Sequence, residues 1–263
     1  TLAAKKRLDL EVRLRRAIEL NELRVYFQPQ IDIKTNKIIG AEALVRWQEP
    51  AQGLISPALF IPVAEETGLI KPLGQWVLQE TCRQGRCWLD KGLPEITLAV
   101  NISPVQFRYS NIQESVASAL AQTGFPPSLL ELELTESALM THEDEAVNVL
   151  KSLREQGVRL AIDDFGTGYS SLAYLKRFPL DVLKIDKSFV DDIPHKKDDM
   201  EIAATIVAMA KTLRLKVLAE GVETPEQLAF LKEEGCDSYQ GYLMSPPVPA
   251  DKFEQLLRSQ AES

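Results

Sequence analysis

Eight short apolar segments alternate along this chain with longer segments of helical periodicity, and no linker rich in proline, glycine or serine interrupts the series. The strand-like segments span residues 24–30, 38–47, 97–102, 130–135, 159–163, 182–185, 216–219 and 238–240. Strands that are covered on both faces are continuously apolar, and a repeated strand–helix order is typical of a parallel sheet. The series therefore predicts an α/β fold, a TIM-like (β/α)8 barrel. A doubly wound open sheet is the alternative, because it also gathers residues at strand ends.

Local signals support this division into strands and helices. Residues 34–37 form a polar turn that is short enough to join the first two strands as an antiparallel hairpin. The periodicity of residues 200–213 predicts a helix with one face made of Ile202, Thr205, Ile206, Met209 and Leu213. Three helix starts pair an N-cap residue with a proline at the first helical position, at Ser56-Pro57, Ser103-Pro104 and Thr224-Pro225.

The charge balance limits the partners of this chain. It carries 30 Lys and Arg against 38 Asp and Glu, a net charge of −8, so we expect no duplex nucleic acid as a partner. No apolar run approaches the roughly 20 residues that span a bilayer, and residues 1–7 are too charged for a secretory signal. We therefore expect no membrane contact from this fragment and a cytoplasmic location, which is compatible with a parent protein anchored to the inner membrane.

Cysteine and histidine usage narrows the kinds of metal site. Cys82, Cys87 and Cys236 lack the spacing of a zinc site, and we expect reduced thiols. His142 and His195 are the two histidines, and both lie in polar surroundings. A histidine-rich zinc or iron site is therefore not expected.

Acidic and amide side chains lie at the ends of the predicted strands. Because the active site of such barrels lies at the C-terminal ends of the strands, we expect these side chains to converge. Hard cations prefer oxygen ligands, and a cluster of uncompensated carboxylates is costly to desolvate. The alternative is that these residues are solvated turn residues or partners in salt bridges. We expect two Mg²⁺ or Mn²⁺ ions, with ligands from Glu42, Asn101, Glu133, Asp163, Asp164 and Glu220.

Lys184 is a cation inside an apolar strand-like segment. Beside a cluster of acids its ammonium would be paired, and it would orient a water molecule or neutralise charge that develops on a substrate. The alternative is a structural ion pair with Asp186 or another acid.

A glycine-rich segment, residues 166–171, follows Asp163 and Asp164. It has a superficial likeness to a dinucleotide-binding fingerprint, but Ser171 stands at the place of the third glycine and two acids separate it from the strand. We interpret the segment as a loop that positions Asp164 and that Glu136 anchors through backbone hydrogen bonds.

Three polar residues near strand ends are candidates for substrate binding. Arg46 could bind a phosphate through charge-assisted hydrogen bonds, and Gln28 and Gln240 could form hydrogen bonds with a base.

Taken together, these residues resemble the EAL-domain cyclic-di-GMP phosphodiesterase family. The resemblance covers about residues 22–258 and is carried, in the family order, by Tyr26-Phe27-Gln28-Pro29-Gln30, Glu42-Ala43-Leu44-Val45-Arg46-Trp47, Asn101-Ile102-Ser103, Glu133-Leu134-Thr135-Glu136-Ser137, Asp163-Asp164-Phe165-Gly166-Thr167-Gly168-Tyr169-Ser170-Ser171-Leu172, Leu183-Lys184-Ile185-Asp186, Ala219-Glu220-Gly221-Val222-Glu223 and Gln240-Gly241-Tyr242.

The resemblance implies a barrel whose first strand runs antiparallel to the others, and hydrolysis of one phosphodiester of cyclic di-GMP to linear pGpG. It implies that Glu42, Asn101, Glu133 and Asp163 bind one ion and that Asp163, Asp164 and Glu220 bind the second. The implied catalytic residues are Lys184, which would contact the attacking water, Glu220, Glu223, which would support the site, and Glu136, which would hold the loop. The implied substrate contacts are Gln28, Arg46 and Gln240.

No residue departs from the family pattern at these positions, which favours an enzyme over a cyclic-di-GMP receptor module with little or no turnover. We expect residues 1–21 to form an N-terminal connector helix, residues 22–258 the phosphodiesterase barrel and residues 259–263 a C-terminal tail. The family implies a homodimer, with contacts near the loop and helix after Asp164, and upstream GGDEF or sensor domains in the parent chain.

Overall fold

A closed eight-stranded barrel forms the centre of the chain in a computed structural model that describes residues 2–168 and 172–261. Around the barrel the strands follow the order β1, β9, β8, β7, β6, β5, β4 and β2, and β2 pairs with β1 to close it. This closure confirms the TIM-like barrel and excludes the doubly wound open sheet. The barrel strands are β1 (Leu23–Asp32), β2 (Ile38–Glu49), β4 (Thr97–Ile102), β5 (Leu130–Thr135), β6 (Arg159–Phe165), β7 (Val182–Ile185), β8 (Lys216–Ala219) and β9 (Ser238–Tyr239).

Strand β1 runs antiparallel to both of its barrel neighbours, whereas β2 and β4 to β9 form a parallel series. The hairpin turn after β1 explains the reversal, because a connection this short can only join antiparallel strands. In the turn, Oδ1 of Asp32 accepts hydrogen bonds from the backbone N–H groups of Lys34 and Thr35. Asn36 adopts a left-handed conformation with φ of 56°. The expected antiparallel first strand is thus confirmed.

Two further strands were not expected from the sequence. β3 (Gly53–Ile55) pairs with the end of β2, and β10 (Val248–Pro249) pairs with β1. Segments of two or three residues are too short to show a period, so only pairing with the longer strands defines them.

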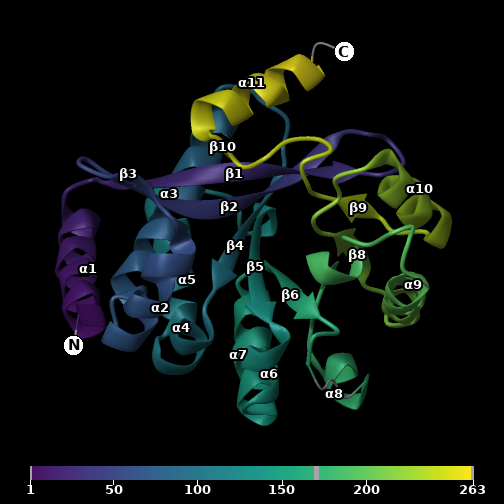
Figure 1. Cartoon of the computed structure of the whole chain (residues 1–263), viewed down its shortest axis with the longest axis horizontal. Helices are drawn as coiled ribbons and strands as arrows, with labels where there is room; N and C mark the ends of the chain where they lie inside the picture. Colours follow the sequence, from purple (N-terminus) through teal and green to yellow (C-terminus); the bar gives the residue numbers. More distant parts are fainter. Residues whose placement is uncertain (1, 169–171, 262–263) are drawn as a thin grey trace.

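Helices cover the outside of the barrel (Figure 1). The predicted starts are confirmed: Ser56 caps α2, and Ser103 and Thr224 form capping boxes with Gln106 and Gln227. Two 3₁₀ turns, η1 (Pro127–Leu129) and η2 (Lys187–Phe189), complete the connections. The helices are α1 (Leu2–Glu19), α2 (Pro57–Thr67), α3 (Ile70–Asp90), α4 (Pro104–Tyr109), α5 (Ile112–Thr123), α6 (Glu136–Met140), α7 (Glu143–Glu155), α8 (Leu172–Arg177), α9 (Lys197–Thr212), α10 (Pro225–Glu234) and α11 (Ala250–Ala261).

The two terminal helices pack against the body of the domain. Helix α1 buries Leu14 and Ala17, and the guanidinium of Arg13 lies 5.7 Å from the ring centroid of Trp47 on β2. Helix α11 continues to Ala261, past the expected barrel end at residue 258. The side chain of Gln260 accepts from the backbone N–H of Ile38 at 2.6 Å and donates to its carbonyl at 3.2 Å.

The predicted face of α9 was partly wrong. Its buried residues are Asp199, Ala203, Ile206, Val207 and Ala210, whereas Ile202 is 39% exposed. The packed face thus includes the small side chains of Ala203 and Ala210, which hydrophobicity alone did not reveal.

Alternation along β1 separates the apolar layer from the barrel interior. Phe27 points outward, and its ring centroid lies 4.9 Å from that of Trp88 on α3 and 5.8 Å from that of Phe253 on α11. The next residue, Gln28, is buried on the other face, opposite Glu42 in the β1–β2 register. The hydrophobic effect that fixes Phe27 therefore also fixes the inward direction of Gln28.

Candidate metal and substrate site

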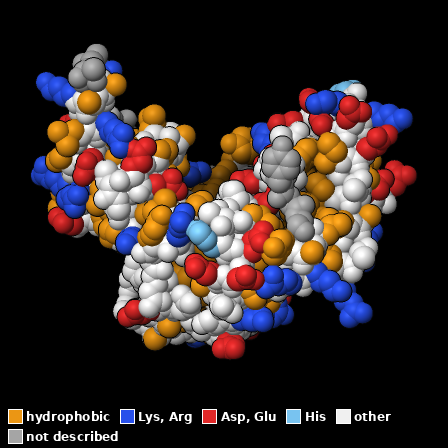
Figure 2. All heavy atoms as spheres, turned by 90° about the horizontal axis from the view of Figure 1, so that it is seen from below, with side chains coloured by type: hydrophobic (Ala, Val, Ile, Leu, Met, Phe, Trp, Pro, Cys, Tyr) orange, Lys and Arg blue, Asp and Glu red, His pale blue; other side chains and the backbone are white. Residues whose placement is uncertain are grey.

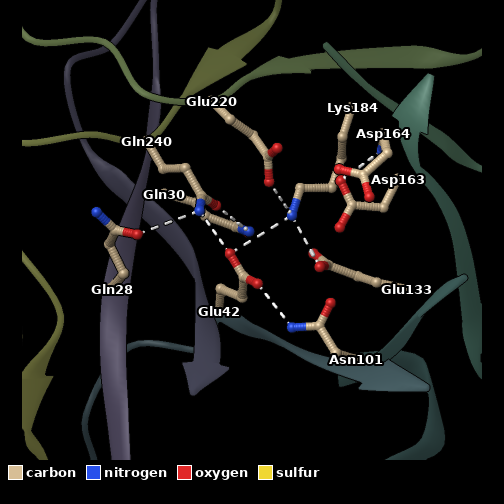
Figure 3. Close-up of polar contacts among 10 residues, drawn as sticks. All are labelled: Gln28, Gln30, Glu42, Asn101, Glu133, Asp163, Asp164, Lys184, Glu220 and Gln240. Atoms are coloured by element: carbon tan, nitrogen blue, oxygen red, sulfur yellow. Dashed lines mark hydrogen bonds and ion pairs between the residues drawn. The ribbon is translucent and has the colours of Figure 1, made fainter. Parts of the chain in front are cut away.

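Eight of the predicted site residues meet at one end of the barrel. Figure 3 shows their side chains pointing toward one another from seven successive segments. Most of them come from the C-terminal halves or ends of parallel strands, as the barrel fold requires, whereas Glu42 lies in the part of β2 that pairs with β4. These residues are Glu42 on β2, Asn101 on β4, Glu133 on β5, Asp163 and Asp164 on β6, Lys184 on β7, Glu220 after β8 and Gln240 after β9.

Lys184 is the centre of this cluster. Its Nζ atom lies 2.6 Å from Oε1 of Glu220, 2.8 Å from Oε2 of Glu133 and 3.5 Å from Oε2 of Glu42. Its side chain is fully buried, and although burial opposes its charge, the surrounding carboxylates raise the pKa of Lys184 well above its ordinary value. Asp186, the alternative partner, instead caps η2 by accepting from the N–H of Ser188.

Glu42 is held by donors on three sides. Nδ2 of Asn101 lies 2.7 Å from Oε1, and Nε2 of Gln240 lies 2.5 Å from Oε2. Burial opposes the ionised form, but the charge of Lys184 and the two amide donors hold the pKa of Glu42 below its usual value. Glu42 is therefore an oriented carboxylate.

The other acids are less well compensated. Burial is the main cause that raises the pKa of Glu133 well above its ordinary value, and neighbouring carboxylates add to the effect of burial while Lys184 opposes it. Burial and the same kind of crowding raise the pKa of Glu220 to about 8. For Asp164, burial, the charge of Asp163 and a hydrogen bond with Asp186 raise the pKa to about 6. One ammonium group does not balance these carboxylates, so the cluster favours additional positive charge.

The donor set fits hard divalent cations. Carboxylate oxygens of Asp163, Asp164 and Glu220 all lie within 4.8 Å of one another. Oε1 of Glu133 is buried without a hydrogen-bond partner among the described residues, and an orphaned carboxylate oxygen at this place is suited to a cation. All of these donors are oxygens, the ligand type that Mg²⁺ and Mn²⁺ prefer.

The loop after β6 is tied to Glu136 at the start of α6. Oε2 of Glu136 accepts from the backbone N–H of Gly166 at 3.1 Å, and the carboxylate also accepts from the N–H of Gly168. Gly166 has φ of +93°, which favours glycine, and Asp164 has φ of 54°. The structure brings together the anchor and the loop that the sequence suggested, while residues 169–171 of the expected loop lie outside the described residues.

Glu223 does not reach the central cluster. Its carboxylate is half exposed and lies 3.0 Å from Nζ of Lys187, and its backbone N–H donates to Oε1 of Gln227 at 2.7 Å. The stem of Lys187 packs over Gly221, where an added Cβ would lie 2.4 Å from Cγ of Lys187. Glu223 therefore contacts the segment that carries Glu220 and lies apart from the other acids.

A cavity of about 310 Å³ adjoins the cluster on the side of Asn101 and Arg46. Much of its lining is apolar, including Ile61 and Leu73. The guanidinium of Arg46 lies 5.5 Å from the ring centroid of Tyr26 and donates to the carbonyl of Val45. Figure 2 shows the face toward which β4, β5 and β6 point in Figure 1; it is hollowed between two raised parts, and basic side chains are scattered among acidic ones.

One member of the buried network was missed by sequence reasoning. Gln30 lies on the same face of β1 as Gln28, and its Nε2 donates to Oε1 of Gln240 at 3.0 Å. The two-residue spacing of Gln28 and Gln30 in a strand was a signal that both face the lumen.

These features define a TIM-like barrel with a cluster of acidic side chains, of a kind suited to divalent cations, at the carboxyl ends of its strands. The chain belongs to the EAL domain family, whose match covers residues 11–247. Within the described residues, no helix combines the length and the apolar character that crossing a membrane requires.

Relatives and a solved structure agree with this assignment. The chain is 48% identical over 258 residues to the bifunctional diguanylate cyclase/cyclic di-GMP phosphodiesterase MucR of Pseudomonas aeruginosa, covering 98% of this chain and 37% of that protein. It is also 48% identical to the cyclic di-GMP phosphodiesterase NbdA of the same organism, covering 97% of this chain and 33% of that one. The PaMucR phosphodiesterase in complex with c-di-GMP superimposes with a TM-score of 0.90 at 47% identity, over 93% of this chain and 99% of that structure. The chain thus spans about a third of the length of these two relatives.

Proposed function

We propose that this domain hydrolyses one phosphodiester of cyclic di-GMP to linear pGpG and that it needs two Mg²⁺ or Mn²⁺ ions. The observation that carries the proposal is a cluster of five carboxylates around a buried ammonium: Lys184 forms ion pairs with three of them, and Glu220, one of those three, lies within 4.8 Å of the remaining two, Asp163 and Asp164. The names of the relatives MucR and NbdA support cyclic di-GMP as the substrate.

The ligands divide into two groups that share Asp163. Glu42, Asn101, Glu133 and Asp163 would hold one ion, and Asp163, Asp164 and Glu220 the other. The ions would supply Lewis acidity, which neutralises the negative charge of phosphoryl oxygens. Glu136 would keep Asp163 and Asp164 in place by holding Gly166, and Glu223 would support the segment that carries Glu220 through Lys187.

Lys184 would act on the reacting oxygens through its positive charge. Its ammonium keeps its proton because the surrounding carboxylates favour the charged form. The ammonium group would donate a hydrogen bond to the attacking water, and its charge would stabilise the negative charge that develops on the phosphate. Lys184 is therefore proposed as an electrostatic catalyst and not as the general base.

Substrate recognition is proposed for the neighbouring wall. Arg46 would bind a phosphate, and the apolar cavity of about 310 Å³ beside it has room for a planar base. Gln28 and Gln240 would add hydrogen bonds, although both side chains are largely buried here and Gln240 is bonded to Glu42. Dimerisation and upstream GGDEF or sensor domains are proposed from the family alone.

Product analysis tests this function. The 263-residue chain is incubated with cyclic di-GMP and either Mg²⁺ or Mn²⁺, with EDTA in a parallel sample, and the nucleotides are separated by chromatography and weighed by mass spectrometry. Linear pGpG that forms only with the metals is the expected result. Binding of cyclic di-GMP without any product would reject the enzyme and support the receptor module.

A further inference from the structure

Gln30 is buried in the barrel interior, two residues along β1 from Gln28, and is only 4% exposed. Its one hydrogen bond within the cluster goes from Nε2 to Oε1 of Gln240 at 3.0 Å (Figure 3). Among the described residues no hydrogen bond joins the side chain of Gln30 directly to an acid, so we expect its effect on the acids to pass through Gln240.

The direction of each amide follows from Glu42. An ionised carboxylate only accepts hydrogen bonds, so Gln240 has to present its NH₂ group to Oε2 of Glu42, which lies 2.5 Å away. The carbonyl oxygen of Gln240 then faces Gln30, which has to be a donor. Gln28 fits the same order, because its Oε1 accepts from Gln240 at 3.3 Å and its Nε2 donates to the carbonyl of Ser245 at 3.3 Å.

Gly40 makes room for this arrangement on the neighbouring strand. It pairs with Gln30 in the β1–β2 register, and a Cβ atom there would lie 2.7 Å from Oε1 of Gln30 and 2.9 Å from the carbonyl oxygen of Thr97. On its other side Gln30 lines a cavity of about 250 Å³, which Glu131 also lines. Replacement side chains of similar length therefore have space in the lumen.

We propose that Gln30 is a positioning residue for the cation site: it fixes the amide of Gln240 so that the NH₂ group, and not the carbonyl, faces Glu42. The inference rests on the proposed function, because Glu42 is a proposed ligand. Without a donor at position 30, the carbonyl of Gln240 is left unpaired in a buried place and the amide no longer has one preferred orientation. A carbonyl oxygen turned toward Glu42 repels the carboxylate and changes its orientation relative to the proposed cation.

Two isosteric variants of Gln30 test this role through Mn²⁺ affinity, measured by calorimetry without substrate. Gln30→Glu replaces the donor by an acceptor, and we expect about tenfold weaker binding, since changes behind a ligand typically cost 10- to 100-fold in affinity. Gln30→Met removes the donor without adding charge, and its loss is expected to be smaller. Glu131→Gln is the matched control, because Glu131 lines the same cavity without touching the amides, and it keeps wild-type affinity.

A double-mutant cycle separates positioning from a general structural effect. If Gln30 acts through Gln240, then Gln30→Met changes the Mn²⁺ affinity in the wild-type background and leaves it unchanged in a Gln240→Met background. An equal loss in both backgrounds overturns the inference, as does wild-type Mn²⁺ affinity of Gln30→Met. Where charge in the lumen prevents Gln30→Glu from folding, Gln30→Met decides.

The same samples keep the two proposals apart. A wild-type chain that binds Mn²⁺ but forms no pGpG contradicts the proposed function, while the affinities still decide the role of Gln30. Normal hydrolysis together with unchanged Mn²⁺ affinity of both Gln30 variants contradicts the role of Gln30 alone.

Discussion

The Nζ atom of Lys184 lies 2.8 Å from Oε2 of Glu133, and neither side chain is exposed to solvent. Glu133 and Lys184 belong to β5 and β7, so this ion pair links two strands across the one between them. A buried ion pair adds little to the stability of the fold, because desolvation of the two charges offsets their attraction. Removing one partner, however, leaves the other charge buried and uncompensated.

Lys184→Met tests how far the metal-free fold depends on that ammonium. We expect the free energy of unfolding in EDTA to fall by about 3–5 kcal/mol, because the buried carboxylates lose their cation. Urea denaturation measures this, with Lys187→Met as the control: that lysine forms exposed ion pairs, and its loss costs at most about 1 kcal/mol. If the two variants were equally stable, protonation of the buried carboxylates would be enough to compensate for the missing ammonium.

Glu42→Ala should abolish hydrolysis of cyclic di-GMP while the barrel still folds. The reason is that Glu42 is the oriented, ionised carboxylate of the cluster, and without it one of the two proposed cation positions loses a ligand. Chromatography of the products and thermal unfolding of the same sample check the two halves of this statement. Near-normal turnover would refute the metal role of Glu42.

Arg46→Ala should raise the KM for cyclic di-GMP roughly tenfold or more, since a hydrogen bond to a charged group is worth about 1.5–3 kcal/mol. Mn²⁺ affinity should not change, because Arg46 lies on the wall beside the apolar cavity, where its guanidinium donates to the carbonyl of Val45. Arg24→Ala is the control, as Arg24 is the register partner of Arg46 on β1 and its side chain bonds the carbonyls of Asn21 and Leu23. A parallel loss of Mn²⁺ affinity in Arg46→Ala would contradict a role limited to substrate.

Glu136→Ala should weaken the cation position formed by Asp163, Asp164 and Glu220. Its carboxylate holds Gly166, so without it the segment after β6 loses its anchor, and a drop of about tenfold in affinity is typical for such support. Calorimetric titration with Mn²⁺ measures the stoichiometry and affinity of both positions. Two unaltered binding steps together with unaltered kcat would remove the anchoring role.

Cys82 and Cys236 should resist alkylation in the folded chain. Burial raises the pKa of each thiol to about 12, so the reactive thiolate is roughly one part in 10,000 at pH 8. Because the pKa is raised, the thiolate fraction grows only as the pH approaches that value. Mass spectrometry after iodoacetamide treatment, with and without urea, should find these two residues modified only in urea; modification of folded Cys82 would contradict the packing around α3.

Much of the fold was predictable because sequence patterns over short stretches mark its strands, its first turn and the starts of its helices. The alternating series, the short turn at residues 34–37 and the capped helix starts each had a physical cause that acts within a few residues. Strands β3 and β10 depend on pairing partners far along the chain, and the buried face of α9 depends on what packs against its alanines. Those features are set by tertiary contacts and left no periodic signal.

The residues of the candidate site were largely predictable from the sequence, whereas the hydrogen bonds between them were less so. Strand ends predicted that Glu42, Glu133 and Asp163 would converge, since parallel strands deliver their ends to one face. The chain of amides from Gln30 to Glu42 and the separation of Glu223 from the cluster depend on side-chain directions. Those directions follow from tertiary packing, although the i, i+2 spacing of Gln28 and Gln30 already placed both on one face.

The reversed strand β1 holds the two interior glutamines by the pleat alone. A slip of one residue would turn Gln28 and Gln30 toward the helices and bring Phe27 and Pro29 inward, yet the acids and Lys184, which sit on other strands, would keep their places. The two glutamines therefore stand on a different strand from the acids, and Gln30 is connected to Glu42 through the amide of Gln240. A register change in β1 would thus leave the carboxylates on their own strands and remove the donor that faces the carbonyl oxygen of Gln240.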